Sequence, residues 1–255
     1  MNAVIQKISD VLRAFSPAEN RRHFTSAVIL AAGSGERFGQ KYGPKQFCPI
    51  CSVPALVHTL RAFEASDYIQ EILIVTRDAD ILRCQEYVDT YGLKKVTKIL
   101  PGGADRQASA KCGFDAVSEK AEFVALHDGA RCLITAEIID ATIRSAYEHG
   151  AAVAAERSRD TVKIAADNGY IKESPDRNTV WLAKTPQVFM ADMYRAAIYS
   201  AQKDNVTATD DSMLVERLGF KVKMVECGNE NLKLTTPNDV RIAEAILRAR
   251  QEEMI

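Results

Sequence analysis

The sequence predicts an α/β fold in which a mostly parallel sheet carries helices on both faces and a β-hairpin arm is inserted. Between residues 26 and 148, short apolar runs alternate with longer segments of helical periodicity, which is the pattern of repeated βα units with right-handed crossovers. Beyond residue 150 the apolar runs become short, and Asn168-Gly169 between two of them is a strong signal of a type I′ hairpin turn. The arm is expected at about residues 156–179.

The first half of the chain contains four predicted βα units. Its strands are short apolar runs, whereas its helices place apolar residues three and four positions apart. The predicted strands cover residues 26–30, 71–76, 96–100 and 123–128, and the predicted helices cover residues 54–64, 79–91, 107–117 and 136–148. Strands built around a continuous apolar run, such as FVALHD at 123–128, are expected to be buried, so the arrangement is Rossmann-like.

The second half departs from this regular alternation. Short strand-like segments at 153–155, 161–165 and 170–173 include the predicted arm, and the segment 179–190 follows it. Helical patterns then occupy residues 193–203 and 210–218, a strand is predicted at 220–225, and a helix at 237–250 closes the chain. Because no low-complexity linker or internal repeat interrupts residues 25–255, a single domain with an inserted arm is expected there.

Residues 1–24 precede this domain and are predicted to form an amphipathic helical extension. Apolar residues recur there at helical spacing before Ser16-Pro17 ends the pattern, namely Val4, Ile8, Val11, Leu12 and Phe15. The charged residues Lys7, Asp10 and Arg13 interrupt the apolar run that a secretory signal would need. The extension is expected to pack on the body of the protein or on a second subunit.

Composition and charge argue against several classes of partner. The chain of 255 residues has a formal net charge of −1 and a sequence pI near 6.5, which does not suit a general binder of nucleic acid or of acidic membrane surfaces. No run of roughly eighteen apolar residues that could span a membrane is present. The six cysteines include Cys48 and Cys51 in a CxxC pattern, but no second pair completes a zinc site, so free thiols in a reducing cytoplasm are expected.

The loop after the first strand is the most informative stretch of the sequence. Residues 30–47 read LAAGSGERFGQKYGPKQF, in which small residues leave backbone N–H groups able to point at phosphate oxygens. The cations Arg37 and Lys45 follow within the same loop. The spacing of Gly33, Gly35 and Gly39 differs from a dinucleotide fingerprint, and no Lys-Ser or Lys-Thr follows Gly39 as in a P-loop. Either a polyphosphate cradle or an ordinary small-residue loop fits these residues taken alone.

Three further segments near the ends of predicted strands carry residues suited to phosphate or metal. Residues 101–109 (PGGADRQAS) form a glycine turn that could bind an anion through free N–H groups, or could simply be a helix start capped by Asp105. Asp128 ends an apolar strand, where it could hold Mg²⁺ or form an ion pair with Arg131. Lys233 precedes a Thr-Pro helix start, either as a solvated charge on an edge strand or as a second phosphate contact.

Together these segments resemble the motifs of the sugar-phosphate and polyol-phosphate nucleotidyltransferases. The opening loop resembles their signature AAGxGxRxxxxxPKQ, while GGADRQAS, HDGAR and NLKLTTPNDV resemble their GGxxRxxS, HDxxR and NIKxTxPxD motifs in the same order. The resemblance extends from about Thr25 to the C-terminus, and within the family it is strongest to the cytidylyltransferases that act on a methylerythritol phosphate. It implies a fold similar to glycosyltransferase A, Mg²⁺ as cofactor, and a homodimer in which the arm of one subunit completes the site of the other. It also implies that a polyol phosphate attacks the α-phosphorus of CTP and that pyrophosphate leaves.

The resemblance also assigns roles to individual residues. It implies that Arg37 and Lys45 bind the triphosphate and stabilise the transition state, and that Lys233 contacts the α-phosphate. Asp128 would hold Mg²⁺, with Glu230 as a second metal ligand. The residues implied in CTP binding are Ala31, Ala32, Gly33, Gly35, Gly103, Ala104 and Ser109, and those implied in binding the acceptor are Arg131, Thr161, Arg177, Thr185 and Thr209. Because a phosphate monoester has a second pKa near 6 and is mostly dianionic at pH 7, the reaction needs no general base.

Two other functions remain open at this point. Ribitol 5-phosphate or another polyol phosphate could be the acceptor, although HDGAR favours methylerythritol phosphate. A non-catalytic nucleotide-binding regulator could share the fold, but such a protein need not keep the cations Arg37, Lys45 and Lys233, which are all present. The sequence therefore predicts a cytidylyltransferase.

Overall fold

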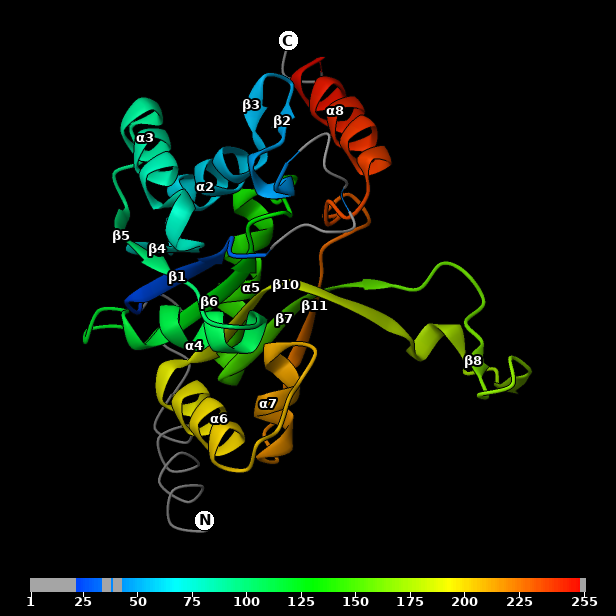
Figure 1. Ribbon diagram of the computed structural model, residues 1–255. Helices are drawn as coiled ribbons and strands as arrows, with labels where there is room; N and C mark the ends of the chain where they lie inside the picture. Colours follow the sequence, from blue (N-terminus) through cyan, green and yellow to red (C-terminus); the bar gives the residue numbers. More distant parts are fainter. Residues whose placement is uncertain (1–21, 34–37, 39–42, 253–255) are drawn as a thin grey trace.

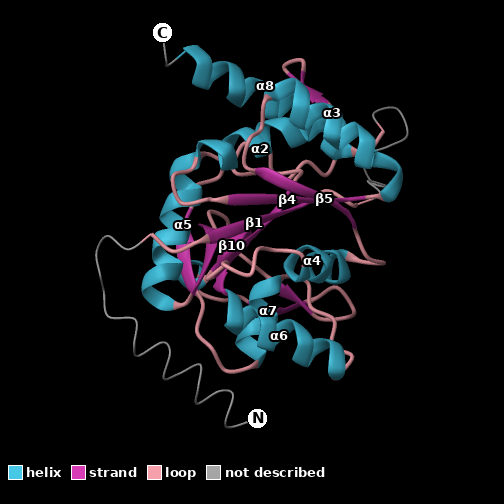
Figure 2. Cartoon of the chain, turned by 90° about the vertical axis from the view of Figure 1, so that its left-hand side faces the viewer, coloured by secondary structure: helices cyan, strands magenta, loops and turns pink. Residues whose placement is uncertain are grey.

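The structure, a computed structural model, describes residues 22–33, 38 and 43–252 of the chain (Figure 1). The helix predicted before residue 16, together with Gly35 and Arg37 of the opening loop, lies outside the described residues. The body of the protein is one seven-stranded sheet with helices on both faces, as the sequence predicts (Figure 2).

The strands of this sheet lie in the order β11-β7-β10-β6-β1-β4-β5. They are β1 (Thr25–Leu30), β4 (Glu71–Thr76), β5 (Val96–Pro101), β6 (Phe123–Asp128), β7 (Ala151–Arg157), β10 (Trp181–Met190) and β11 (Lys223–Glu226). β10 runs antiparallel to its neighbours β6 and β7, and the other neighbouring pairs are parallel. The central strands β1, β4 and β6 are buried along their whole length, which explains the continuous apolar runs at their centres.

Helices cover both faces of the sheet. They are α2 (Ala55–Ala65), α3 (Ile81–Tyr91), α4 (Arg106–Asp115), α5 (Ala136–His149), α6 (Ala191–Lys203), α7 (Asp211–Arg217) and α8 (Pro237–Glu252). Figure 2 shows α2, α3 and α8 above the sheet and α4, α6 and α7 below it. The backbone of α4 lies unusually close to the sheet, because a Cβ at Gly113 would stand 2.8 Å from Val75 Cγ2 and nearer still to Val28. This close packing holds the C-terminal half of α4 against the sheet.

The predicted arm is present and projects away from the body of the protein (Figure 1). Its strands β8 (Ile164–Ala165) and β9 (Ile171–Glu173) pair antiparallel. β8 begins at Ile164 and is therefore shorter than the predicted strand at 161–165. The strand predicted at 220–225 also begins later, at Lys223, where pairing with β7 starts. The apolar residues just before it, Phe220 and Val222, pack against the core without pairing to a strand. Their apolar character made the predicted strand longer than the observed one.

The turn of the arm is not the predicted type I′. That turn needs a positive φ at both central residues, and φ is positive at Gly169 (82°) but not at Asn168. The Ala166 N–H donates to the Tyr170 C=O and the Gly169 N–H donates to the Ala166 C=O, at 2.9 Å each. This is the pattern of a three-residue loop with a glycine bulge, in which Asn168 keeps an ordinary backbone conformation.

A second, smaller apolar cluster supports the loop that follows β1. A short 3-10 turn, Lys45–Phe47, leads from that loop into a hairpin of β2 (Pro49–Ile50) and β3 (Val53–Pro54). The hairpin packs against α8 through buried side chains that include Phe38, Ile50, Leu133, Leu234 and Val240. The C-terminal helix α8 therefore supports the β2–β3 hairpin, which directly follows the opening loop.

The cysteines are all unpaired thiols. Burial raises the pKa of Cys132 to about 12 and that of Cys84 to about 11. Within residues 22–33, 38 and 43–252, no group of three His, Cys, Asp or Glu side chains is arranged to hold a metal ion. Among the helices of this same part of the chain, none combines the length and the apolar character that a membrane span requires.

Candidate active site

A pocket of about 510 Å³ opens at the carboxyl ends of the central strands. It gathers residues from all four segments singled out in the sequence, namely the opening loop, the glycine turn before α4, the end of β6 and the segment before α8. The predicted site residues that line it are Ala31, Ala32, Gly33, Lys45, Gly103, Ala104, Ser109, Asp128 and Lys233. Segments far apart in the chain therefore form one site.

The opening loop is held by Gln46, a residue that the sequence reasoning did not single out. Its Nε2 donates to the Ala31 C=O at 2.7 Å and to the Gly33 C=O at 3.3 Å, and its side chain is buried. Because Gln46 follows Lys45 directly, these bonds also set where that cation meets the pocket. The sequence gives only a weak indication of this role, because all it shows is a glutamine between Lys45 and the apolar Phe47, which is buried in the structure.

The glycine turn before α4 is closely packed. A Cβ at Gly102 would lie 2.7 Å from both Ala32 Cβ and Ser109 Oγ, so glycine is what lets the two loops meet. The Gly103 N–H donates to Ser109 Oγ at 3.1 Å, and the Ser109 hydroxyl donates to the Asp105 C=O at 2.8 Å. Asp105 also caps α4 with its carboxylate. The expectation of free N–H donors is therefore wrong for Gly103, and the turn serves as a small-residue wall of the pocket.

Asp128, at the end of β6, lies among three cations. Its carboxylate oxygens are 2.8 Å from Lys233 Nζ, 3.4 Å from Arg106 Nε and 3.6 Å from Arg131 Nε. Burial alone would raise the pKa of Asp128, but the three cations, Lys233 foremost, hold it well below its usual range. Asp128 is thus an ionised carboxylate at neutral pH. The ion pair between Asp128 and Arg131, one of the two interpretations offered by the sequence, is present together with the pairs to Lys233 and Arg106.

A buried hydrogen-bond chain fixes the backbone around Asp128. The Asp128 N–H donates to Thr185 Oγ1 at 3.1 Å, and the Thr185 hydroxyl lies 3.0 Å from His127 Nδ1. His127 Nε2 lies 3.4 Å from the Arg131 C=O, which can only accept, so the neutral ring donates from Nε2 and accepts at Nδ1. Complete burial lowers the pKa of His127 to about 3 and keeps the ring neutral. The hydroxyl of Thr185, predicted to contact the acceptor, is engaged within the protein.

Arg131 ties the end of β6 to the segment that carries Lys233. Its Nη1 donates to the Asn231 C=O at 2.9 Å, and Asn231 Nδ2 donates to the Thr185 C=O at 2.9 Å. The Asn231 side chain is fully buried, and burial lowers the pKa of Arg131. These bonds place Lys233, two residues after Asn231, beside Asp128.

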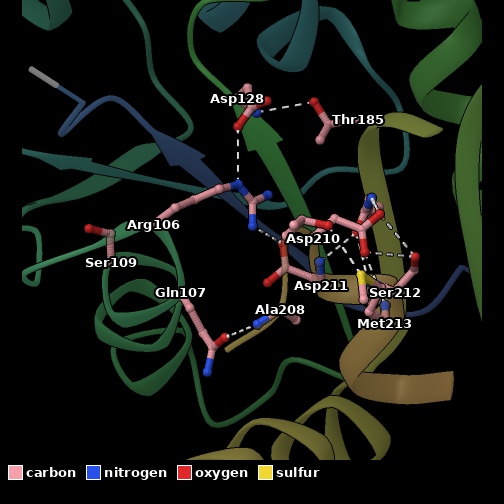
Figure 3. Close-up of polar contacts among 12 residues, drawn as sticks. Arg106, Gln107, Ser109, Asp128, Thr185, Ala208, Asp210, Asp211, Ser212 and Met213 are labelled. Carbon is pink, nitrogen blue, oxygen red and sulfur yellow. Dashed lines mark hydrogen bonds and ion pairs between the residues drawn. The ribbon is translucent and has the colours of Figure 1, made fainter. Parts of the chain in front are cut away.

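Arg106 and Asp211 are two more residues that the sequence reasoning missed. Arg106 is the first residue of α4 and reaches from the pocket wall to Asp128 on one side and Asp211 on the other (Figure 3). An arginine in the glycine-turn segment was visible in the sequence, but nothing there indicates its second partner. The two partners of this ion pair lie on different helices, and a contact of that kind has no local signature.

Of the predicted site residues that the structure describes, six do not line the pocket; Arg131 and Thr185 contact Asp128 from behind it, and four lie elsewhere. Thr161, Arg177 and Thr209 are exposed and are not among the residues that line the pocket. Glu230 Oε2 lies 2.7 Å from Arg250 Nη2, and Glu230 does not line the pocket with Asp128. Within one subunit, the structure thus brings together the predicted nucleotide residues it describes, but not the whole predicted acceptor set.

Comparison with known proteins points to one family. The family model described as 2-C-methyl-D-erythritol 4-phosphate cytidylyltransferase matches residues 25–249. The chain is 40% identical over 229 residues to the protein of that name from Alkaliphilus oremlandii, an alignment that covers 89% of this chain and 97% of the relative. It is 41% identical over 224 residues to the one from Caldanaerobacter subterraneus, with coverage of 88% and 98%. The crystal structure of 4-diphosphocytidyl-2C-methyl-D-erythritol synthase from Anaerococcus prevotii is similar with a TM-score of 0.80 at 31% identity, covering 89% of this chain and 96% of that one.

Proposed function

This chain belongs to the 2-C-methyl-D-erythritol 4-phosphate cytidylyltransferase family, and we propose that it catalyses that transfer at the pocket around Lys45, Asp128 and Lys233. The family identity makes it a CTP-dependent nucleotidyltransferase of isoprenoid biosynthesis. In the reaction, the phosphate of methylerythritol 4-phosphate forms a new P–O bond to the α-phosphorus of CTP, and the bond to pyrophosphate breaks. The products are 4-diphosphocytidyl-2-C-methyl-D-erythritol and pyrophosphate. The cytoplasm is the proposed location, because the free thiols suit a reducing compartment.

The barrier to this transfer is mainly electrostatic, because a dianionic phosphate must approach a triphosphate. The observation that carries the proposal is that two lysines, Lys45 and Lys233, line one pocket with the ionised Asp128. Lys233 keeps 36% of its side chain exposed, so it can turn from Asp128 toward an incoming phosphate. Cations placed in advance stabilise the charge that grows on the α-phosphate in the transition state. We assign Arg37 to the same task from its place in the opening loop.

The nucleoside of CTP is proposed to lie against the wall made by the opening loop and the glycine turn. Backbone and small side chains dominate that wall, so a flat base can approach the main chain closely. The residues assigned to it are Ala31, Ala32, Gly33, Gly103, Ala104 and Ser109, with Gly35 from the part of the loop outside the described residues.

Mg²⁺ is the proposed cofactor, and the donor chemistry of the pocket suits it. Magnesium in nucleotide sites is held by one or two carboxylates together with phosphate oxygens, and Asp128 supplies an ionised carboxylate in the pocket. When bound, the ion neutralises part of the phosphate charge. Glu230 is assigned less directly, because its carboxylate is paired with Arg250 and would have to leave that partner to serve as a second ligand.

A homodimer is proposed because the arm carries features that one subunit does not use. Ile164, Tyr170 and Ile171 are 42%, 76% and 63% exposed on the projecting hairpin, and apolar side chains gathered on such a surface favour a protein partner. Thr161 and Arg177, assigned to the acceptor, lie on the same arm outside the pocket. The arm of a second subunit would bring them to the site, where Arg131, Thr185 and Thr209 complete the proposed acceptor set.

The test of this function is the release of pyrophosphate by the purified protein. The assay supplies CTP and Mg²⁺ with either methylerythritol 4-phosphate or ribitol 5-phosphate as acceptor. Turnover with methylerythritol 4-phosphate and little with ribitol 5-phosphate is expected. Turnover with ribitol 5-phosphate alone would reject the proposed acceptor, and no turnover with any acceptor would reject the enzyme assignment.

A further inference from the structure

Arg106 reaches two carboxylates at once, one inside the pocket and one outside it. Its Nε lies 3.4 Å from Asp128 Oδ1, and its Nη1 lies 2.8 Å from Asp211 Oδ2 (Figure 3). Asp128 lines the pocket together with Arg106, whereas Asp211 does not line it. One guanidinium therefore links the nucleotide pocket to the start of α7.

Asp211 is built as an anchor for this guanidinium. Its side chain is 1% exposed, its Oδ1 accepts the Tyr194 hydroxyl at 2.7 Å, and its N–H donates to Gln187 Oε1 at 3.0 Å. Burial raises the pKa of Asp211, and Arg106 opposes that rise. A buried carboxylate is stable only with its cation and hydrogen bonds in place, so Arg106 is held firmly on the side away from Asp128.

The segment just before α7 is bound to the same end of α4. Gln107 Nε2 donates to the Val206 C=O at 3.0 Å, and the Ala208 N–H donates to Gln107 Oε1 at 3.0 Å. The first two residues of α4 thus hold residues 206–211 by side-chain contacts (Figure 3). Thr209, which the proposed function assigns to the acceptor, lies in this segment.

The three cations around Asp128 differ in what else holds them. Lys233 is the most exposed of the three, and Arg131 is bound to a backbone carbonyl, that of Asn231. Arg106 is the one that, among the described residues, also pairs with a second carboxylate. When Lys233 turns toward a phosphate, Arg106 keeps its place because Asp211 retains it.

We propose that Arg106 is a positioning residue of the transfer reaction that fixes the Asp128 carboxylate relative to residues 206–211. The inference rests on the proposed function, which places the nucleotide beside Asp128 on one side of this link and Thr209, one of the residues assigned to the acceptor, on the other. Lysine cannot replace Arg106, because a single ammonium lacks the planar fork that spans two carboxylates. Loss of either Arg106 or Asp211 lets the two halves of the site shift, and a shift of about 1 Å can cost about a hundredfold in rate.

The experiment compares steady-state kinetics of wild type, Arg106→Lys, Asp211→Asn, the double variant and Tyr194→Phe, with melting curves for each. Asp211→Asn, although outside the pocket, is expected to lower kcat at least about tenfold while the KM for CTP stays within about threefold. The double variant should be no slower than the slower single variant, since both changes break one link. Tyr194→Phe removes a hydrogen bond from Asp211 without touching Arg106, and its kcat should stay within about twofold of wild type.

Each outcome is decisive. The wild-type assay tests the proposed function alone, so an inactive wild type rejects that function and not the link. With an active wild type, a kcat for Asp211→Asn within about twofold of normal overturns the role of Arg106. Additive losses in the double variant, or a Tyr194→Phe loss as large as that of Asp211→Asn, would overturn it as well. If Asp211→Asn does not fold, the kcat of Arg106→Lys is the test, and an unchanged kcat in that variant overturns the role of Arg106 in the same way.

Discussion

Replacing Asp128 by asparagine tests whether its carboxylate organises the pocket. The change keeps the shape of the side chain but leaves Lys233, Arg106 and Arg131 around a neutral amide. At an effective dielectric constant of about 20, a pair of unit charges 4 Å apart interacts by about 4 kcal/mol before desolvation is counted. Removing one partner of a buried ion pair costs about 3–5 kcal/mol in measured cases. Because Lys233 and Arg106 keep roughly a third of their side chains in water, about 3 kcal/mol is expected.

Thermal denaturation at pH 7 measures this loss. For a domain of this size, about 3 kcal/mol corresponds to a fall in Tm of about 6–12 °C. The three uncompensated cations should bind polyphosphate without Mg²⁺, so CTP or pyrophosphate should restore more of the Tm of Asp128→Asn than it adds to wild type. Turnover with CTP and Mg²⁺ should nevertheless fall at least about a hundredfold, because the proposed magnesium ligand is gone.

Asp105→Asn is the matched control for this experiment. Asp105 also lines the pocket, and asparagine caps a helix as well as aspartate does, so the change removes one negative charge while the cap of α4 remains. Its Tm should move by no more than about 2 °C. If Asp128→Asn melts within that same margin, or if polyphosphate stabilises it no better than wild type, the electrostatic account of the pocket is wrong.

Three further predictions concern other parts of the protein. Lys45→Ala should leave the melting curve intact and lower turnover at least about a hundredfold, and near-normal kinetics would remove Lys45 from the transition state. Burial lowers the pKa of His127 to about 3, so below about pH 6.5 the unfolded chain binds a proton there that the folded chain does not, and the stability of the fold falls with the pH. Between pH 7 and pH 5 this loss of stability is about 2 kcal/mol. Urea titrations should show the loss in wild type but not in His127→Asn. Ile171→Glu on the arm should shift the protein from dimer to monomer in analytical ultracentrifugation, whereas a monomeric wild type would reject the proposed homodimer.

Sequence alone could predict the sheet and most of the pocket because both depend on local patterns. A strand that is buried on both faces is mostly apolar, and β1, β4 and β6 show this in their central residues. Residues that follow parallel strands meet at one edge of the sheet, so Gly33, Asp128 and the turn before α4 could be placed together without knowing any contact. The motifs added the lysines to the same edge.

The features that sequence reasoning missed depend on contacts between distant parts of the chain. Gln46 is recognisable as a support only when its amide is seen to hold the backbone of the opening loop. The turn at Asn168-Gly169 follows the register of β8 and β9, which leaves one more residue in the loop than a type I′ turn allows. Glu230 forms an ion pair with Arg250 of the last helix, and no local sequence pattern predicts that pair.

The two interpretations that the sequence left open for Asp128, a structural ion pair and a metal ligand, describe one arrangement. A buried carboxylate at the end of β6 is stable only because cations surround it. The same cations are what a triphosphate needs, so ion pairs within the pocket can be exchanged for contacts to the nucleotide. Exposure separates Lys233 from Arg131, since their side chains are 36% and 12% exposed. Arg106 is 30% exposed, but it is also paired with Asp211, and Lys233 has no second carboxylate among the described residues. Lys233 is therefore the cation best placed to leave Asp128 for the α-phosphate in the proposed reaction, with Arg131 and Arg106 holding the carboxylate in place.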